Sequence, residues 1–205
     1  MASTALPPPN HHAHFPAFAG PTGLLAALSM VRGRTDVARL AADLTEVGAG
    51  DQVIDVGCGP GAAAREAARR GAVVTGVDPA AVMLRVARRL TRRSASITWV
   101  EGRAERLAQP DDSATVVWSL AAVHHWADVG AGVAEARRVL RPGGRLLVTE
   151  RLVRAGAEGL SSHGWIEPQA ESFAIACRDA GFVDVVVEEH RPGGTAVLVV
   201  RALAP

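Results

Sequence analysis

The chain of 205 residues has no lysine and no tyrosine, so all 22 of its basic side chains are arginines. Without lysine, no mechanism can use an ε-amino base or a Schiff base, and without tyrosine none can use a phenol. The two cysteines, Cys58 and Cys177, are too few for a disulfide framework or a four-cysteine zinc site. A domain of this length buries enough surface to fold without either.

An excess of charge of one sign is also lacking, because 22 basic and 21 acidic side chains leave a formal charge of +1. No global field is therefore expected to hold nucleic acid or an anionic membrane. The apolar stretch 17–31 is shorter than the ~20 residues of a membrane span, and Pro21 interrupts it. The first basic residue is Arg32, so no secretory signal is expected and the predicted location is the cytoplasm.

The apolar pattern alternates between strands and helices along most of the chain. Strands are predicted at 52–56, 73–77, 97–100, 115–120, 145–149, 183–189 and 196–201. Helices are predicted at 24–32, 35–46, 62–70, 79–91, 128–140 and 169–180. This order is typical of an α/β fold with a doubly wound, mainly parallel, seven-stranded sheet. Only the turn at 192–194 separates the last two strands, so these are expected to pair antiparallel at one edge.

The most informative segment is Asp55-Val56-Gly57-Cys58-Gly59-Pro60-Gly61, where three alternating glycines follow a strand and precede a helix. Glycines at this place allow a tight turn and a close approach of the backbone to a ligand. The start of the next helix offers free N–H groups to that ligand. Asp78 ends the following strand, where a carboxylate can accept hydrogen bonds from both ribose hydroxyls of a nucleoside.

A dinucleotide such as NAD is one reading of this turn, because Gly57, Gly59 and Ala62 fit the pattern G-x-G-x-x-A. Asp55 argues against it, since a carboxylate two residues before the first glycine would repel a pyrophosphate. The same carboxylate would suit a ligand that carries an ammonium group.

The segment from Asp55 to Gly61 resembles the first motif of class I S-adenosylmethionine-dependent methyltransferases, of the small-molecule type with methyltransferase domains 11 or 25. Further segments match the family in the same order: Gly76-Val77-Asp78-Pro79, Met83-Leu84, Glu101-Gly102-Arg103-Ala104-Glu105, Ala122-Val123-His124-His125-Trp126 and Arg138-Val139-Leu140-Arg141-Pro142-Gly143-Gly144. The resemblance covers about residues 35–201. It implies the Rossmann-like methyltransferase fold and S-adenosyl-L-methionine as the cofactor.

The resemblance also implies a set of cofactor-binding residues, which come from the glycine turn, the end of the second strand and the loops that follow. They are Asp55, Gly57, Cys58, Gly59, Gly61, Asp78, Pro79, Met83, Ala104, Glu105 and Ser119. By this resemblance the glycines would face the methionine part of the cofactor, Asp55 would lie near its ammonium, and Asp78 would hold the ribose.

The adenine end departs from the family pattern. Met83 would pack near adenine, and Ala104 and Glu105 would line its pocket. The family usually places an aspartate before them to bind the exocyclic amine, but this chain has Arg103, which can only donate. Glu105 or a backbone carbonyl is the expected substitute. Ser119 would lie beside the methionine tail.

Candidates for proton transfer follow the fourth and fifth strands. His125 is the first candidate for a general base, with His124 second, although the family often uses such a His-His-Trp segment to shape the pocket. Glu150 ends the fifth strand and is either a third candidate or the partner of a neighbouring arginine. His163, in the loop before the last helix, ranks below His125.

Three further histidines lie near the N-terminus: His11, His12 and His14. Their spacing suits a metal ion, but no acidic or cysteine partner is near them in the sequence, and three consecutive prolines precede them. Residues 1–14 are therefore predicted to be a flexible tail, and no metal site is expected.

The remaining chain divides into an N-terminal helical part at 15–50 and a cofactor-binding methyltransferase domain at 51–205. Only about 18 residues separate the fifth strand from the next helix, so no large inserted lid is expected. Residues 15–32 and the loop around Trp165 are the predicted cover of the cofactor site.

A small-molecule methyltransferase is the favoured function, with transfer to O, N or C of an unidentified acceptor. A nucleic-acid or protein methyltransferase is less favoured. The position where such enzymes often carry Asn/Asp-Pro-Pro-Tyr reads Ser119-Leu120-Ala121-Ala122 here. A non-catalytic module that binds S-adenosylmethionine or a nucleotide is the third reading, and an NAD-dependent oxidoreductase is the fourth.

Overall fold

The computed structural model describes residues 6–13, 35–91 and 96–205. The α-helices are α2 (Thr35–Leu44), α3 (Ala62–Arg69), α4 (Ala81–Leu90), α5 (Val129–Val139) and α6 (Glu167–Asp179). The strands are β1 (Gln52–Val56), β2 (Val73–Asp78), β3 (Ile97–Glu101), β4 (Ala114–Leu120), β5 (Leu140–Arg151), β6 (Val183–His190) and β7 (Val197–Leu203). Short 3₁₀ turns are η1 (Val123–His125), η2 (Gly159–Ser162) and η3 (Pro192–Gly194).

The seven strands form one sheet in the order β3-β2-β1-β4-β5-β7-β6. The first five strands pair in parallel, and β7 lies antiparallel between β5 and β6. This confirms the predicted doubly wound, mainly parallel sheet with an antiparallel strand in its last pair. Because the parallel strands end at one edge, the loops that follow β1, β2, β4 and β5 meet there.

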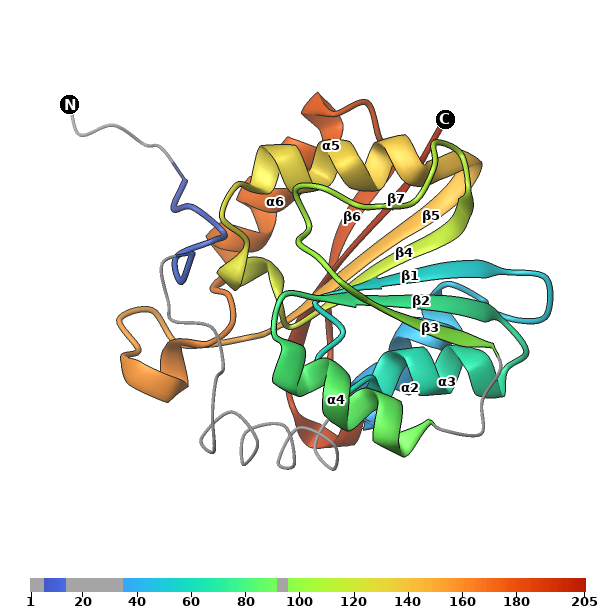
Figure 1. Ribbon diagram of the computed structural model, residues 1–205. Coiled ribbons are helices and arrows are strands. Elements are labelled where there is room, and N and C mark those ends of the chain that lie inside the picture. Colours follow the sequence, from blue (N-terminus) through green and yellow to red (C-terminus); the bar gives the residue numbers. More distant parts are fainter. Residues whose placement is uncertain (1–5, 14–34, 92–95) are drawn as a thin grey trace.

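Helices cover both faces of the sheet (Figure 1): α5 and α6 lie over one face, and α2, α3 and α4 lie over the other. Successive side chains of a strand point to opposite faces. On β4, Val117 therefore joins the core beneath α5 and α6, whereas Trp118 joins the core beneath α2 and α3. The indole N–H of Trp118 donates to Thr45 Oγ1 at 3.2 Å, which ties the end of α2 to the centre of the sheet.

Several predicted boundaries differ in the structure, three of them in informative ways. Helix α2 ends at Leu44 rather than Glu46, whose φ of 49° is incompatible with a continued right-handed helix. Helix α4 begins after Pro79, because Asp78 Oδ1 accepts the Ala80 N–H at 2.8 Å and holds the chain extended there. Strand β5 begins at Leu140, so it includes the Pro-Gly-Gly segment that the sequence analysis assigned to a turn.

The N-terminal residues 6–13 are bound to the domain, where the sequence analysis expected a flexible tail. The carbonyls of the prolines at 7–9 accept hydrogen bonds from Ser172 Oγ, Gln169 Nε2 and Trp165 Nε1, at 2.8, 2.9 and 2.7 Å respectively. Proline has no N–H, so such a segment offers only acceptors, and these satisfy the polar side chains on and near α6. Local sequence could not reveal this, since the partners are more than 150 residues away.

The predicted helix at 24–32 and the predicted cover at 15–32 lie outside the described residues. None of the helices in the described part of the chain has the length and apolarity that a membrane span requires.

Helix α5 begins at the predicted cap, since Asp128 Oδ1 accepts the Ala131 N–H at 3.0 Å. We expect Asp128→Ala to lower the free energy of unfolding by about 1 kcal/mol, because that N–H loses its acceptor. For a chain of this size the melting temperature should fall by about 2–4 °C. Glu171→Ala, on the exposed surface of α6, is the matched control and should change stability by less than about 0.5 kcal/mol. Equal melting temperatures of the two variants would contradict the assigned cap.

Candidate functional site

The glycine turn after β1 is held against the end of β2. Gly57 and Cys58 both donate their N–H groups to the carbonyl of Val77, at 2.8 and 3.0 Å. Gly57, Gly59 and Gly61 have φ values of 72°, 52° and 79°, in the left-handed region where a Cβ is strained. The turn therefore requires glycines for its backbone conformation before any ligand is considered.

The three glycines differ in what surrounds them. A Cβ on Gly57 would clash with Ala122, in the loop after β4, and a Cβ on Gly61 would clash with the indole ring of Trp99 on β3. A Cβ on Gly59 would meet nothing within 4 Å. Gly57 and Gly61 are thus packing positions, whereas Gly59 borders open space at the edge where the parallel strands end.

Asp78 binds the same turn from β2. Its Oδ2 accepts the Gly59 N–H at 2.8 Å, its Oδ1 accepts the Ala80 N–H, and the side chain is buried. Each oxygen of a carboxylate can accept more than one hydrogen bond. The contacts with the backbone are therefore compatible with a further role in binding ribose hydroxyls, the role that the resemblance implies for Asp78.

Asp55 has a structural role that the sequence analysis missed. Its carboxylate is buried, and Oδ2 accepts the Ala64 N–H at 3.1 Å in the first turn of α3. Gly61 is the N-cap residue and has no side chain to offer, so Asp55 supplies the acceptor from the neighbouring strand.

Burial raises the pKa of the Cys58 thiol, and the charges of Asp55 and Asp78 add to this shift. Cys58 therefore stays protonated at neutral pH and is no nucleophile.

The other expected cofactor-binding residues vary in exposure. Pro79 is exposed, and Met83 and Ala104 are buried. Glu105 Oε1 accepts the N–H groups of Ala127 and Asp128 at 2.7 and 3.1 Å, which orders the chain before α5. The sequence analysis did not foresee this second use of Glu105.

Ser119 lies near the end of β4 and is fully buried. Its hydroxyl has no hydrogen-bond partner among the described residues. A buried polar atom in this state costs free energy unless a ligand or water satisfies it. The structure thus marks Ser119 as a residue with capacity for a ligand contact.

A histidine from the loop after β4 and a glutamate near the end of β5 pair tightly. His124 Nδ1 lies 2.8 Å from Glu150 Oε2, and the His124 backbone N–H donates to Glu150 Oε1 at 3.3 Å. The side chains are 3% and 0% exposed. A carboxylate can only accept, so His124 carries a proton on Nδ1 and its Nε2 points away from Glu150. Within the described parts of the chain, Glu150 therefore pairs with His124 rather than with an arginine.

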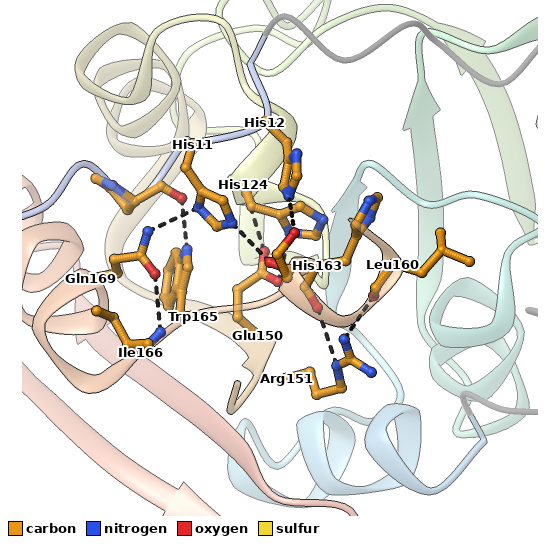
Figure 2. A network of polar contacts seen from close by, with 12 residues as sticks. His11, His12, His124, Glu150, Arg151, Leu160, His163, Trp165, Ile166 and Gln169 are labelled. Atoms are coloured by element: carbon orange, nitrogen blue, oxygen red, sulfur yellow. Dashed lines mark hydrogen bonds and ion pairs between the residues drawn. The ribbon is translucent and has the colours of Figure 1, made fainter. Parts of the chain in front are cut away.

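Histidines from three separate segments gather around this pair (Figure 2), and we refer to His12, His124, His125 and His163 as the histidine cluster. The His12 N–H donates to the His124 carbonyl at 2.8 Å. Arg151 Nε donates to the His163 carbonyl at 3.2 Å, which fixes the loop before α6. His14 lies outside the described residues.

Burial affects the protonation of His12, His125 and His163. It lowers the pKa of His125 to about 3 and that of His163 to about 4, and in both cases His124 is the second cause. Burial and the neighbouring His11 also lower the pKa of His12. At neutral pH these rings are therefore uncharged. The sequence analysis identified His124, His125 and His163 as separate candidates but did not predict that His12 lies beside them.

Comparisons with known proteins give one consistent result. Residues 54–148 match the family described as "Methyltransferase domain". A demethylmenaquinone methyltransferase of Tropheryma whipplei is 39% identical over 112 residues, which are 55% of this chain and 46% of that protein. The methyltransferase GfsG of Streptomyces halstedii is 34% identical over 172 residues, 75% of this chain and 62% of its own length. The chain thus spans about half to three fifths of the length of these relatives.

Among solved structures, a SAM-dependent methyltransferase from Aquifex aeolicus superposes with a TM-score of 0.74. The superposition covers 89% of this chain and 98% of that one, at 14% sequence identity. At this identity the similarity establishes the fold, which agrees with the sheet order described above.

The contrast between Gly59 and Gly61 is testable. Alanine at either position must adopt the left-handed backbone conformation, which costs about 1–2 kcal/mol of stability. Gly61→Ala also overpacks the ring of Trp99, so we expect it to be less stable than Gly59→Ala by about 1–3 kcal/mol. Gly59→Ala should stay folded and weaken the binding of S-adenosylhomocysteine at least about tenfold, because its methyl group enters the ligand space. Thermal denaturation and calorimetry measure the two effects, and a Gly59→Ala protein that binds normally would place the ligand elsewhere.

Proposed function

Because this chain belongs to the class I S-adenosylmethionine-dependent methyltransferase family, we propose that it transfers a methyl group from S-adenosylmethionine to a hydroxylated small molecule. The observation that carries the proposal is the position of the His124–Glu150 pair. His124 belongs to the loop after β4, whose Ala122 packs against Gly57 of the glycine turn, and Glu150 reaches it from β5, so a proton acceptor lies near the expected cofactor site.

The residues present fit the cofactor. Gly59 borders open space, Asp78 has acceptor capacity for ribose hydroxyls, and the hydroxyl of Ser119 is buried without a partner among the described residues. The buried carboxylates Asp55 and Asp78 lie at the same edge, and their negative charge favours a cation such as the sulfonium and ammonium of S-adenosylmethionine. The same charge disfavours the pyrophosphate of NAD.

When bound, the cofactor supplies an electrophilic methyl group whose transfer is an in-line displacement. The protein has to orient the acceptor and remove its proton. Glu150 holds the imidazole of His124 in one orientation, with Nε2 available to accept a proton from a hydroxyl. Glu150 would then stabilise the imidazolium that forms, as a carboxylate does for an oriented histidine base.

His124 is favoured over His125 for this role because Glu150 orients its ring. A general base works best when its pKa lies near the working pH, and burial lowers the pKa of His125 to about 3. His125 and His163 are better suited to line the acceptor side as neutral hydrogen-bonding groups.

The class of acceptor is inferred from chemistry and from one relative. A base beside the methyl donor suits a hydroxyl on an aromatic or quinol-type ring, whose deprotonation makes either the oxygen or a ring carbon nucleophilic. The Tropheryma whipplei relative is named for demethylmenaquinone, a quinone-type molecule, which supports the same class for this chain.

Cofactor binding is the first test. We expect calorimetry to show binding of S-adenosylmethionine and S-adenosylhomocysteine, with NAD much weaker. Asp78→Asn should weaken S-adenosylhomocysteine binding about tenfold or more, because hydrogen bonds to a charged acceptor contribute on the order of 1.5–3 kcal/mol. Asp179→Asn, at the end of α6, is the control and should bind as the parent does. Tighter binding of NAD, or an unchanged dissociation constant in Asp78→Asn, would contradict the cofactor assignment.

Methyl transfer is the second test, with radiolabelled S-adenosylmethionine and a panel of hydroquinones, phenols and small carboxylic acids. We expect transfer to a hydroxylated ring. His124→Gln should lower kcat by about 10²–10⁴-fold because the proton acceptor is lost, while S-adenosylhomocysteine binding changes little. His190→Gln, on β6 and outside the histidine cluster, should keep parental activity. Cofactor binding without transfer to any of the panel would favour the non-catalytic module.

A further inference from the structure

The histidine cluster is more compact than a general base requires. Ligand atoms of His124, His125 and His163 all lie within 4.8 Å of one another. The ring centroids of His124 and His125 are 4.1 Å apart, and those of His12 and His163 are 4.5 Å apart. These residues come from three segments that the fold brings together at the edge of the sheet where β4 and β5 end.

Such distances are close to those of a metal coordination sphere. When zinc–nitrogen distances are about 2.0–2.1 Å, two ligands of a tetrahedral ion lie about 3.3 Å apart. Small rotations about the side-chain bonds would bring nitrogens that lie within 4.8 Å to that spacing. His125 and His163 are only partly buried, so an ion has a route to the cluster.

Glu150 orients the most buried ring. Metal-binding histidines usually donate the N–H of their other ring nitrogen to a carboxylate or carbonyl, which fixes the ring and raises its basicity. His124 and Glu150 have this arrangement at 2.8 Å, with Nε2 turned away from the carboxylate. A fully buried carboxylate is costly without a compensating positive charge, and a cation on His124 would supply one.

His11 lies next to the cluster but has a different role. Its Nδ1 accepts from Gln169 Nε2 at 2.9 Å, and its Nε2 donates to the carbonyl of Ser162 at 2.9 Å. The Gln169 amide is itself oriented by the Ile166 N–H, which donates to its oxygen at 3.0 Å. With both nitrogens engaged, His11 positions the N-terminal segment and is not a ligand.

We propose that His124, His125 and His163 form a binding site for a divalent first-row transition metal ion, with His12 beside it and Glu150 orienting His124. Imidazole ligands suit Zn²⁺, Fe²⁺, Co²⁺, Ni²⁺ or Cu²⁺, whereas Mg²⁺ and Ca²⁺ require oxygen ligands that the three histidines do not provide. Three protein ligands leave a coordination position open, which is typical of catalytic sites rather than structural ones.

The open coordination position gives the ion a role in the proposed function, and this role rests on that function. A hydroxyl bound to the ion at that position would lose its proton more readily, and the ion would hold the oxygen beside the methyl donor. The ion would then take over the task that His124 performs as a base. The metal site itself does not depend on this role.

The test uses the full chain, purified without a histidine tag and freed of metal with a chelator. Calorimetry with ZnCl₂ should show one ion per chain, and CoCl₂ should give the visible absorption bands of four- or five-coordinate Co²⁺. We expect His125→Ala and His163→Ala each to weaken Zn²⁺ binding at least about tenfold and to abolish the Co²⁺ bands. Glu150→Gln should weaken Zn²⁺ binding about 10–100-fold, because the orienting carboxylate is lost.

His190→Ala is the matched control, because it removes a histidine that lies on β6 outside the cluster, and it should bind as the parent does. Circular dichroism establishes that each variant is folded. If His125→Ala fails to fold, His163→Ala, on the loop before α6, decides the outcome. The proposal is overturned if no saturable uptake of one ion occurs, or if folded His163→Ala binds as tightly as the parent. The titration involves neither cofactor nor acceptor, so it is independent of the methyl-transfer assay.

Discussion

Gly59 and Ala80 donate hydrogen bonds to the buried carboxylate of Asp78. These bonds hold together the edge of the sheet where the parallel strands end. Hydrogen bonds to a charged acceptor are shorter and stronger than neutral ones. Here they fix the glycine turn to the end of β2, set where α4 begins, and thereby direct the start of α3. Asp55 adds a second buried carboxylate that caps α3. The two charges favour a cationic ligand at this edge, so under the proposed function the residues that hold the turn would also serve binding.

Much of this arrangement is readable from the sequence, because its causes are local. The apolar strands, the alternating glycines and the cap at Asp128 all appear in the predicted places, since each depends on residues a few positions apart. The sequence analysis misplaced the start of β5, where pairing of Leu140 with Ala114 overrides the turn preference of Pro-Gly-Gly. It also assigned Asp55 to a ligand without seeing that Gly61 left α3 in need of an acceptor.

The histidine cluster was less accessible to sequence reasoning. His124 and His125 stand out because they follow β4, but nothing near them in the chain indicates Glu150 or His163 as neighbours. His12 joins them only because the carbonyls of residues 7–9 satisfy polar side chains around α6, a set of contacts that spans most of the chain. Trp165 and Gln169 are buried, and each carries a side-chain N–H that needs an acceptor. That need was the available signal that a distant segment docks beside α6.

The docking of residues 6–13 has a consequence for the order in which the protein is completed during synthesis. These residues are made well before Trp165, their partner, which follows Pro9 by 156 residues. At 5–20 residues per second that interval is on the order of ten seconds. Strand β7, which lies between β5 and the edge strand β6, is made later still. The nascent chain therefore carries His12 without its final neighbours until the segment around Trp165 has been made, and residues 6–13 cannot dock before then.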